Sequence, residues 1–371
     1  MTYYEFFAGG GMARAGLGAA WRCLFANDFD PLKARTYQAN WGEAHFVRGD
    51  VWALRPAQLP GRADLAWASS PCQDFSLAGA RAGLDGGRSS AFWGFWRQIE
   101  ALNREGRAPR AVVIENVTGL LNSRGGEDFT ALCAGLAGQG YRFGALEIDA
   151  AAFLPQSRPR VFVLATREAP PAMLTGDSPL HTSAVRAARD RLPEVLRARW
   201  IDWSPVPPAA RNTDLASVLE PDDQALWRKP EQTRALLAQM NASHRAQVDA
   251  AVRSGERRIG AVFRRIRIED GRRVQRAEAR FDGLAGCLRT PRGGSSRQLL
   301  LVIERGKARS RWVSGREGAR LMGLPDDYVL PKAATSALHV VGDGVAAPVV
   351  RFLAAQLLEP LLRRQVPLAA E

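Results

Sequence analysis

The chain has few cysteines and histidines, and nothing in their spacing suggests a metal or disulfide site. Among its 371 residues are four cysteines, widely scattered without a C-x-x-C pair, and four equally dispersed histidines. This excludes a disulfide framework and gives no support for a zinc site, and it fits a reducing cytoplasm. We therefore expect no bound metal.

Export signals and long apolar runs are also missing. The first five residues have neither a basic flank nor an apolar core, and no apolar stretch is long enough to span a bilayer. Apolar residues make up 46% of the chain and charged residues 24%, which is typical of a soluble globular protein. We expect a cytoplasmic, nucleoid-associated protein with no membrane partner.

Lysine is scarce, and the positive charge is concentrated in one arginine-rich segment. The formal net charge is +13, and residues 253–316 hold 17 Arg and one Lys against six acidic residues, a net of +12. Codon bias explains Arg over Lys but not the clustering. Such a segment is typical of a surface that binds a polyanion, and a solvated, charged β-surface is the alternative interpretation.

Short apolar runs alternate with helical patterns in the first third of the chain. Strands are expected at residues 3–7, 22–26, 64–68, 111–114 and 160–165, and helices at about 13–19 and 31–40. Strands that alternate with helices predict βαβ units and a mainly parallel, doubly wound α/β sheet.

The pattern changes after about residue 167. Proline-rich linkers give way to a helical stretch near 231–252 and then to two hairpins, with turns at 269–271 and 305–307. The shift predicts a second, smaller, irregular and β-rich domain. The expected domains are residues 1–170 plus 333–371, and residues 171–332.

A glycine-rich turn follows the first predicted strand. Phe7, Gly9, Gly10 and Gly11 lie where a backbone without side chains can approach a ligand closely. Arg14 stands where the third glycine of G-x-G-x-x-G would fall, which disfavours a dinucleotide-binding oxidoreductase.

Acidic residues follow the next strands. Asp28 is placed to hydrogen-bond ribose hydroxyls, and its neighbour Phe29 could stack on an adenine. Asp50 follows another strand-like run. Each acid alone is more often a helix cap, but together they predict an adenosine pocket.

Cys72 is the strongest single indication of chemistry. It lies in the sequence Pro71-Cys72-Gln73, just after the buried strand expected at 64–68. Ligands bind at the carboxyl ends of strands in open α/β sheets, and a thiolate there can attack an electron-poor carbon. A small buried hydrophobe is the alternative interpretation.

Two further motifs are predicted at the same edge. Glu115 follows the strand at 111–114 and could act as an acid or hydrogen-bond donor. Arg158 and Arg160 lie at the edge of another strand, where a guanidinium can hold a carbonyl oxygen or a phosphate. Ordinary surface charge is the alternative for both arginines.

Taken together, these motifs resemble those of the DNA cytosine-5 methyltransferases. The family's six ordered motifs appear as Phe7–Gly11, Pro71–Gln73, Glu115–Val117, Gln156–Arg160, Arg316–Pro325 and Gly342–Val345. One departure is Asp343, where the family usually has Asn.

The resemblance implies a site for S-adenosylmethionine and a base-modifying centre. The implied cofactor residues are Phe7, Gly9, Gly10, Gly11, Asp28 at the ribose, Phe29 at the adenine face, Asp50 at the adenine amino group, Val51 and Pro71. Cys72 would attack C6 of a cytosine flipped out of the helix, Glu115 would contact N3, and Arg160, supported by Arg158, would hold O2.

The resemblance also implies a double-stranded DNA substrate, a role in restriction–modification and a monomer. The implied DNA contacts are Gln73, Arg88, Arg292, Ser295, Ser296, Arg297 and Gln298. Residues 76–91 would form a loop that closes over the flipped base, and 171–332 would recognise the target. An RNA cytosine-5 methyltransferase and a non-catalytic DNA-binding paralogue stay as alternatives.

Overall fold

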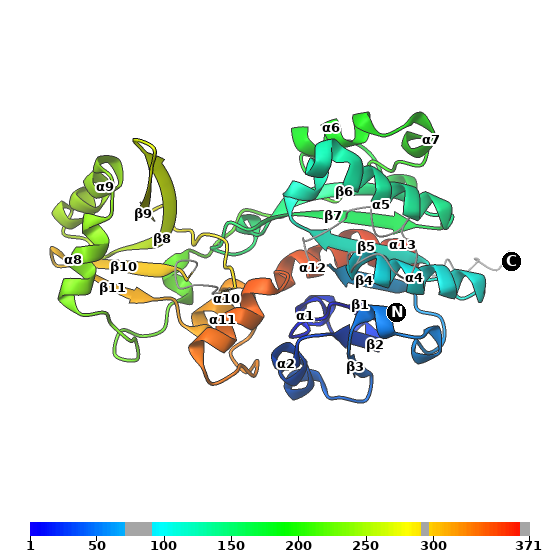
Figure 1. Ribbon diagram of the computed structural model, residues 1–371, viewed down its shortest axis with the longest axis horizontal. Helices are drawn as coiled ribbons and strands as arrows, with labels where there is room; N and C mark the ends of the chain where they lie inside the picture. The colour runs from blue at the N-terminus through cyan, green and yellow to red at the C-terminus, as the bar shows by residue number, and fades with distance from the viewer. Residues whose placement is uncertain (71–90, 291–296, 364–371) are drawn as a thin grey trace, which may run out of the picture. The chain divides into compact units, whose positions relative to one another are not determined.

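The structure is a computed structural model that describes residues 1–70, 91–290 and 297–363. The chain forms two compact units, coloured by position in Figure 1. The first unit contains Met1–Asp149, Pro159–Ala209 and Ala347–Glu371, and the second contains Ala150–Arg158 and Ala210–Ala346.

These bounds differ from the expected 171–332 at both ends. Residues 172–203 belong with the first unit because they pack along its sheet. The backbone of Phe143 exchanges hydrogen bonds with Arg199 (3.0 Å) and Ile201 (2.7 Å), and the indole of Trp203 donates to the carbonyl of Leu164 at 3.1 Å.

The first unit is built on a seven-stranded sheet with the order β3-β2-β1-β4-β5-β7-β6. The strands are β1 (Thr2–Phe6), β2 (Arg22–Asp28), β3 (Phe46–Arg48), β4 (Leu65–Ser69), β5 (Ala111–Asn116), β6 (Arg142–Asp149) and β7 (Pro159–Thr166). Neighbours from β3 to β5 are parallel, whereas β7 is antiparallel to both β5 and β6. The predicted doubly wound, mainly parallel α/β sheet is confirmed.

The first unit also contains helices, some of which connect these strands. They are α1 (Met12–Leu17), α2 (Pro31–Trp41), α4 (Ala91–Arg104), α5 (Glu127–Gly138), α6 (Ser183–Arg191), α7 (Glu194–Arg197), α12 (Ala347–Leu353) and α13 (Glu359–Leu362), with a π-helix at Ala354–Leu358. Short 3₁₀ turns lie at Val51–Ala53, Pro56–Gln58, Thr118–Leu121, Ser123–Gly126 and Ala172–Leu174. The start of α2 shows local control by sequence, since the Asp30 side chain accepts from the N–H groups of Leu32 and Lys33 and Pro31 follows directly.

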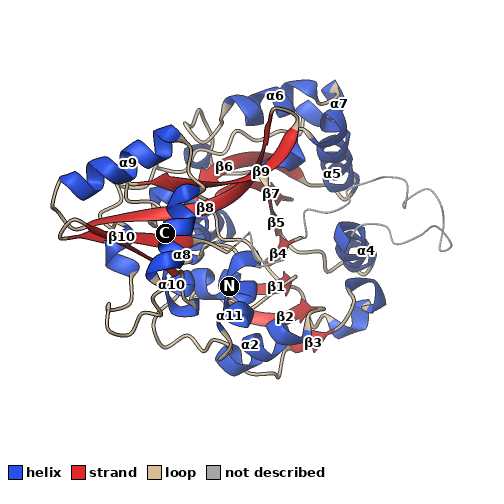
Figure 2. Ribbon diagram, turned by 60° about the vertical axis from the view of Figure 1, so that its left-hand side comes forward, coloured by secondary structure: helices blue, strands red, loops and turns tan. Residues whose placement is uncertain are grey.

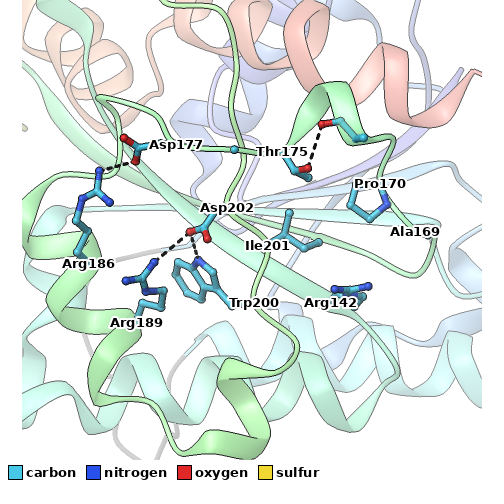
Figure 3. A pocket seen from close by; sticks show the side chains of 12 residues that line it. Arg142, Ala169, Pro170, Thr175, Asp177, Arg186, Arg189, Trp200, Ile201 and Asp202 are labelled. Carbon is cyan, nitrogen blue, oxygen red and sulfur yellow. Dashed lines mark hydrogen bonds and ion pairs between the residues drawn. The ribbon is translucent and has the colours of Figure 1, made fainter.

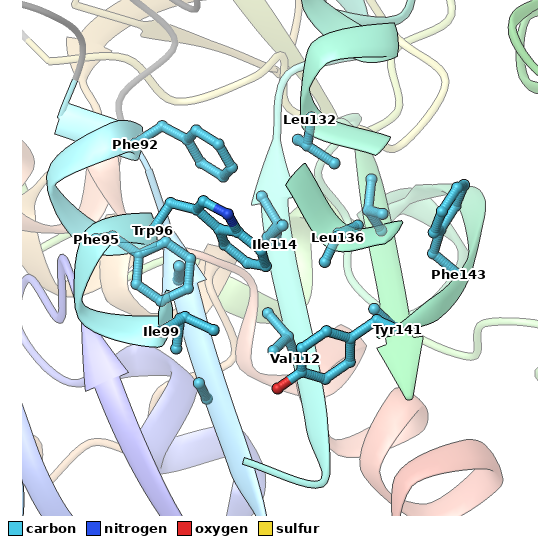
Figure 4. Close-up of a cluster of buried hydrophobic side chains, with 14 of the residues drawn as sticks. Phe92, Phe95, Trp96, Ile99, Val112, Ile114, Leu132, Leu136, Tyr141 and Phe143 are labelled. Atoms are coloured by element: carbon cyan, nitrogen blue, oxygen red, sulfur yellow. The ribbon is translucent and has the colours of Figure 1, made fainter. Parts of the chain in front are cut away.

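A large aromatic core fixes the middle of this sheet (Figure 4). Phe92, Phe95, Trp96 and Ile99 recur at helical spacing on α4 and are fully buried. Figure 4 shows them beside Val112 and Ile114 of β5 and Leu132 and Leu136 of α5. This packing makes β4 and β5 a rigid base for whatever their carboxyl ends carry.

The second unit contains a four-stranded antiparallel sheet in the order β11-β10-β8-β9. Its strands are β8 (Arg258–Glu269), β9 (Arg272–Arg280), β10 (Leu299–Glu304) and β11 (Lys307–Trp312). The two predicted hairpins are confirmed. Both have two-residue turns with positive φ, at Asp270-Gly271 and Arg305-Gly306, the geometry that matches the twist of paired strands.

The helices of the second unit are α8 (Pro230–Ala238), α9 (Ala242–Arg253), α10 (Gly315–Leu321) and α11 (Ala334–Asp343), with 3₁₀ turns at Ala150–Ala152 and Leu215–Val218. The helical stretch expected near 231–252 consists of two helices, α8 and α9. The chain leaves the helix at residues 239–241, and the side chain of Asn241 caps α9 by accepting from the N–H of His244. Helices α8 and α9 lie against one face of the four-stranded sheet (Figure 2).

One stretch corrects an expectation about hydropathy. Residues Ala334–Leu362 are long and apolar enough to cross a membrane by length and composition alone. Of the 18-residue window in this stretch that meets the hydropathy criterion, 67% is buried in the structure. The core helices of soluble proteins pass the same test, so the stretch is weak evidence for a membrane span.

Candidate active site

A strained glycine turn follows β1. Phe7, Gly9 and Gly11 all have positive φ, at 56°, 57° and 81°. The carbonyl of Gly10 accepts from the indole N–H of Trp41 at 3.1 Å. A Cβ added to Gly11 would lie 2.3 Å from that indole nitrogen, whereas one added to Gly9 would meet no atom within 4 Å. Only glycine fits at position 11, and the space beside Gly9 is open.

The Asp28 carboxylate fastens this turn to the end of β2. Its Oδ2 accepts from the N–H of Gly9 and its Oδ1 from the N–H of Asp30, each at 2.8 Å. Burial raises the pKa of Asp28 above its ordinary value. Next to it, the ring of Phe29 is 73% exposed. The edge of the sheet thus presents a fixed carboxylate beside an uncovered aromatic ring.

Asp50 lies close to the same place in the sheet. The side chain of Asn27 donates to the carbonyls of Val47 and Gly49, at 2.9 and 3.0 Å, and so ties the end of β2 to the segment after β3. Asp50 follows directly and caps the turn Val51–Ala53 by accepting from an N–H at 3.0 Å. Val51 is buried. The predicted cofactor residues that the structure describes are therefore brought together, while Pro71 lies outside the described residues.

Glu5 is an acidic residue that sequence reasoning missed. It is fully buried in β1, and neither of its carboxylate oxygens has a hydrogen-bond partner among the described residues. Burial raises the pKa of Glu5 to about 8, against the opposing effect of the nearby Arg14 charge. The available signal was an acidic side chain in the middle of an otherwise apolar strand.

Glu115 and Arg160 meet at the carboxyl end of β5. The two side chains are paired, with Nε of Arg160 3.0 Å from Oε1 of Glu115, and the carboxylate is buried. This contact depends on the direction of β7. Because β7 runs antiparallel to β5, its first residues reach the edge where β4 and β5 end.

Asn116 positions the end of β4. Its Nδ2 donates to the carbonyl and to Oγ of Ser70 at 3.2 and 3.1 Å, and its Oδ1 accepts from the N–H of Val117 at 2.9 Å. Ser70 is the last described residue before the Pro71-Cys72-Gln73 motif. Cys72, Gln73 and Arg88 lie outside the described residues, as does most of the predicted loop at 76–91.

Arg158 has different surroundings from Arg160. It is buried in the second unit, where its guanidinium donates to the carbonyls of Leu288 (2.9 Å), Gly342 (3.0 Å) and Gly344 (2.6 Å) and to Sγ of Cys287 (3.3 Å). Neither arginine is ordinary surface charge. These contacts give Arg158 a positioning role on the backbone of 342–344.

Asp343 has a partner on a neighbouring segment of the same unit. Its carboxylate accepts a hydrogen bond from Oγ1 of Thr290 and lies 3.7 Å from the imidazole of His339. A Cβ on the preceding Gly342 would come within 2.7 Å of the backbone of Arg289. An Asp in place of the family's Asn is thus accommodated, because the Thr290 hydroxyl donates to its carboxylate where the backbones of Gly342 and Arg289 lie close together.

Two of the five predicted DNA contacts in the second unit are described. Gln298 is buried, and its side-chain amide faces the backbone of Gly286, accepting from the N–H at 2.7 Å and donating to the carbonyl at 3.1 Å. This disfavours a direct contact with DNA. Arg297 is half-buried. The other predicted contacts, Arg292, Ser295 and Ser296, lie outside the described residues.

The comparisons with known proteins decide the family. The family described as "C-5 cytosine-specific DNA methylase" matches residues 1–359. This chain belongs to that family. The predicted resemblance is confirmed, and so is its consequence that the chain is a DNA cytosine-5 methyltransferase.

Several relatives of this C5 methylase match over most of their length. It is 26% identical to the type II methyltransferase M.NlaX of Neisseria lactamica, over 95% of each chain. It is also 26% identical to the type II methyltransferase M.HpaII of Haemophilus parainfluenzae, over 97% of this chain and 90% of that protein. The solved structure of the S. pombe Dnmt2 methyltransferase shares the fold, with a TM-score of 0.61 and 17% identity over 97% of this chain and 99% of that one.

A buried ion pair organises another motif of the C5 methylase. Glu317, in the Arg316–Pro325 motif, accepts from both Nη atoms of Arg311 at 2.8 and 2.5 Å. It also accepts from the N–H groups of Ser314 (3.0 Å) and Glu220 (2.9 Å). Sequence reasoning missed Arg311, because its place beside Glu317 depends on how β11 turns into α10.

A cleft of about 640 Å³ in the C5 methylase lies elsewhere (Figure 3). It is lined by residues after β7 and by Arg142 at the start of β6. Arg142 pairs in register with Thr166, which pairs with Ala111 at the start of β5, so this is the sheet edge opposite Glu115. Two of its carboxylates are already paired with arginines. The cleft is therefore separate from the Glu115 centre.

No metal centre is described in the C5 methylase. Within residues 1–70, 91–290 and 297–363, no group of three His, Cys, Asp or Glu side chains could hold a metal ion. The thiols of Cys23, Cys133 and Cys287 are free.

Proposed function

We propose that the protein transfers a methyl group from S-adenosylmethionine to C5 of a cytosine flipped out of a specific double-stranded DNA sequence. The observation that carries the proposal is the Glu115–Arg160 pair, whose carboxylate is buried at the edge where β4 leads into the Cys72 motif. Family membership supports a cytosine substrate.

The residues around the glycine turn fit the cofactor. Asp28 would accept hydrogen bonds from the ribose hydroxyls, and Phe29 would cover the adenine. The open space beside Gly9 would admit the methionine part of the cofactor close to its sulfur. Asp50 would accept from the adenine amino group, and Val51, Gly10, Gly11 and Phe7 would shape the turn. S-adenosylmethionine, when bound, supplies an electrophilic methyl group.

Cys72 would act as the nucleophile. Its thiolate adds to C6 of the cytosine, while Glu115 donates a proton or hydrogen bond to N3 and so draws electron density toward the ring nitrogen. C5 would then bond to the methyl carbon as the bond between that carbon and the sulfonium sulfur breaks, which would leave a neutral thioether. Transfer of the C5 proton to a base, return of the N3 proton to Glu115 and breakage of the Cys72–C6 bond would restore the aromatic ring and release the Cys72 thiolate.

Arg160 would orient Glu115 and hold the cytosine O2. Its Nε lies 3.0 Å from the carboxylate and its Nη1 donates to the carbonyl of Pro159 at 2.8 Å, so Nη2 would serve the second acceptor. Arg158 would support the centre indirectly by fixing the backbone of 342–344. Asn116 would set the starting point of the loop that carries Cys72 and Pro71.

We propose that the first unit carries the chemistry and the second recognises the DNA target. The second unit contains the basic segment 253–316, with its net charge of +12. Phosphate contacts would position the protein, and a few side chains would read bases. Gln73, Arg88, Arg292, Ser295, Ser296 and Arg297 are the proposed contacts. The working form would be a cytoplasmic, nucleoid-associated monomer.

Bisulfite sequencing of plasmid DNA from a methylation-deficient host tests the proposal. Wild-type protein should protect cytosines at one recurring motif, and the Cys72→Ala variant should protect none. Glu115→Gln should methylate far more slowly, because an amide cannot transfer a proton to N3. Absence of protection with folded wild-type protein would contradict the proposal. Labelled methyl transfer to total RNA would then separate an RNA methyltransferase from a non-catalytic DNA-binding paralogue.

A further inference from the structure

The outer part of the β8–β9 hairpin is a two-stranded ribbon. In the four-stranded sheet, β10 pairs with β8 over Arg258–Val262. Beyond Val262 the described pairing of β8 is with β9 alone, and it continues to the turn at Glu269 and Arg272. At the rise of a β-strand, residues 263–269 span about 20 Å. We call residues 263–278 the β-ribbon, which can be followed in Figure 1.

The covering of the sheet ends near the point where the β-ribbon begins. Core side chains of α8 and α9 pack with Val262, Ala277 and Ala279 on one face of the hairpin. The outer edge of β9 is held at the same level, since the N–H of Ala277 donates to the carbonyl of Gln239 at 3.1 Å. The base of the hairpin is therefore anchored, and the side chains nearer the turn lie beyond this covering.

Four of these side chains form an exposed block, which we call the ribbon face: Ile266, Ile268, Arg273 and Gln275. Ile266 pairs in register with Gln275, and Ile268 with Arg273. Cross-strand partners and every second residue along a strand lie on one side of a sheet, so all four share the side of Val262. Ile266 and Ile268 are 53% and 78% exposed, and Arg273 and Gln275 are exposed as well.

The two faces of the β-ribbon differ in how their charges are compensated. On the opposite face, Arg265 and Arg267 both pair with Glu278. On the ribbon face, the side chain of Arg273 has no ion-pair or hydrogen-bond partner among the residues that the structure describes. The β-ribbon thus presents a free guanidinium, an amide and two aliphatic side chains together on one side.

Charge and size indicate what the ribbon face fits. Residues 263–278 hold six Arg against three acidic residues, a net of +3, which favours a polyanion. Two isoleucines offer little apolar surface beside a stable protein interface, which buries about 800 Å² on each partner. The major groove of B-DNA is about 12 Å wide, admits a two-stranded β-ribbon, and presents hydrogen-bonding and apolar base edges.

We propose that the β-ribbon lies in the major groove of the substrate duplex with the ribbon face toward the bases, and that Arg273 reads a guanine there. The proposal rests on the proposed function, which makes double-stranded DNA the substrate. A guanidinium donates two hydrogen bonds to O6 and N7 of guanine, the commonest specific contact in this groove. Ile266 and Ile268 exclude water beside that contact, and Gln275 bonds to a neighbouring base. The acidic Asp270 at the turn disfavours an approach by the tip.

Selection of bound duplexes from a random library tests the proposal without any methyl transfer. Wild-type protein should enrich one sequence. Arg273→Ala should lose discrimination at one G·C pair of that sequence, by about tenfold or more, and keep it at the other positions. Arg272→Ala is the matched control, because Arg272 is an exposed arginine next in the chain but on the opposite face. It should enrich the wild-type sequence.

Three outcomes of the selection overturn the proposal. One is that Arg273→Ala enriches the same sequence as strongly as wild-type protein. Another is that Arg272→Ala loses discrimination at the same base pair, because the assignment of the two faces would then be wrong. The third is that wild-type protein binds duplex DNA without enriching any sequence. Both arginines are exposed, so the two variants should melt at the wild-type temperature.

Duplexes that contain 7-deazaguanine test the contact at one atom. This base has a C–H in place of N7 and pairs normally with cytosine. At the G·C pair found by selection it should weaken binding of wild-type protein about fivefold, the loss of one hydrogen bond, and leave binding of Arg273→Ala unchanged. An equal loss in both proteins overturns the contact.

Bisulfite sequencing with wild-type protein separates this proposal from the proposed function. Methylation of one motif, together with unchanged selection by Arg273→Ala, would refute the β-ribbon contact and keep the methyl transfer. Selection that depends on Arg273, without methylation of DNA, would keep the β-ribbon contact and refute the methyl transfer.

Discussion

The buried pair of Arg311 and Glu317 offers a direct test of how the second unit is held together. Both side chains are 1% exposed, and two hydrogen bonds of 2.8 and 2.5 Å join them. Removing one partner of such a pair leaves a buried charge without compensation, which typically costs about 3 to 5 kcal/mol. In Arg311→Met, Glu317 retains the N–H donors of Ser314 and Glu220. We therefore expect a loss near the lower end, about 3 kcal/mol.

Urea unfolding followed by circular dichroism measures this loss. The double variant Arg311→Met/Glu317→Leu should recover most of it, because replacing both charges by apolar groups removes the uncompensated charge. Hydrogen exchange should show where the effect falls. It should speed up in β11 and α10, which carry the pair, and stay unchanged in β1 to β5 of the first unit.

Two results would refute this reasoning. One is a loss below about 1 kcal/mol for Arg311→Met, which would mean that the carboxylate finds other compensation or solvent. The other is a double variant no more stable than the single one, which would assign the loss to packing and not to charge.

Three further perturbations probe the first unit. Glu5→Gln should remove a pH dependence of the free energy of unfolding. Because the carboxyl pKa is raised to about 8 in the folded state, Glu5 in the wild-type protein should lower that free energy progressively from about pH 5 to pH 8, by at most about 1.4 kcal/mol per pH unit. Urea unfolding at several pH values measures this. Gly11→Ala should weaken S-adenosylmethionine binding at least tenfold in calorimetry, because its Cβ would overlap an indole nitrogen at 2.3 Å. Asn116→Ala should reduce methylation while leaving cofactor affinity unchanged, because it frees the end of β4 at Ser70.

Each of these has a control or a contradicting result. A wild-type stability profile as flat as that of Glu5→Gln between pH 5 and 8 would show that Glu5 is ionised in the fold. Gly138→Ala, in a helix with open space around its Cβ, should bind the cofactor as wild-type protein does. If Gly11→Ala binds S-adenosylmethionine as tightly as wild-type protein does, the proposed role of the glycine turn in cofactor binding is contradicted. A fall in cofactor affinity for Asn116→Ala would contradict the prediction, because it would mean that Asn116 acts on cofactor binding and not on the end of β4.

The sequence predicted the strands whose apolar runs are buried on both faces. β5 and β7 lie within one or two residues of their expected bounds. β6 was missed because Gly144 interrupts its apolar pattern. A Cβ at Gly144 would lie 1.9 Å from the carbonyl of Ile201, so the glycine is required by a segment more than fifty residues away. A contact between such distant residues cannot be recognised from the sequence around Gly144.

The antiparallel direction of β7 also could not be predicted from the sequence. The connection from β6 spans only residues 150–158, too short for the crossover that parallel strands need. Without β6, that argument could not be made. Asp28 and Glu115 were predictable because parallel strands end at one edge, whereas Glu5, Arg311 and the buried position of Gln298 depend on partners that only the folded chain brings together.

The last helices of the chain complete the first unit, and this has a consequence for synthesis. A Cβ on Gly16 of α1 would lie within 2.5 Å of Ala347 and Val350, and Arg351 donates to the carbonyl of Leu17 at 2.7 Å. The helix that follows the glycine turn is therefore packed against residues made much later than the helix itself. On the ribosome the second unit, which ends at Ala346, can fold before the first unit is complete. A transcript truncated shortly before codon 347 would yield a chain that cannot complete this unit.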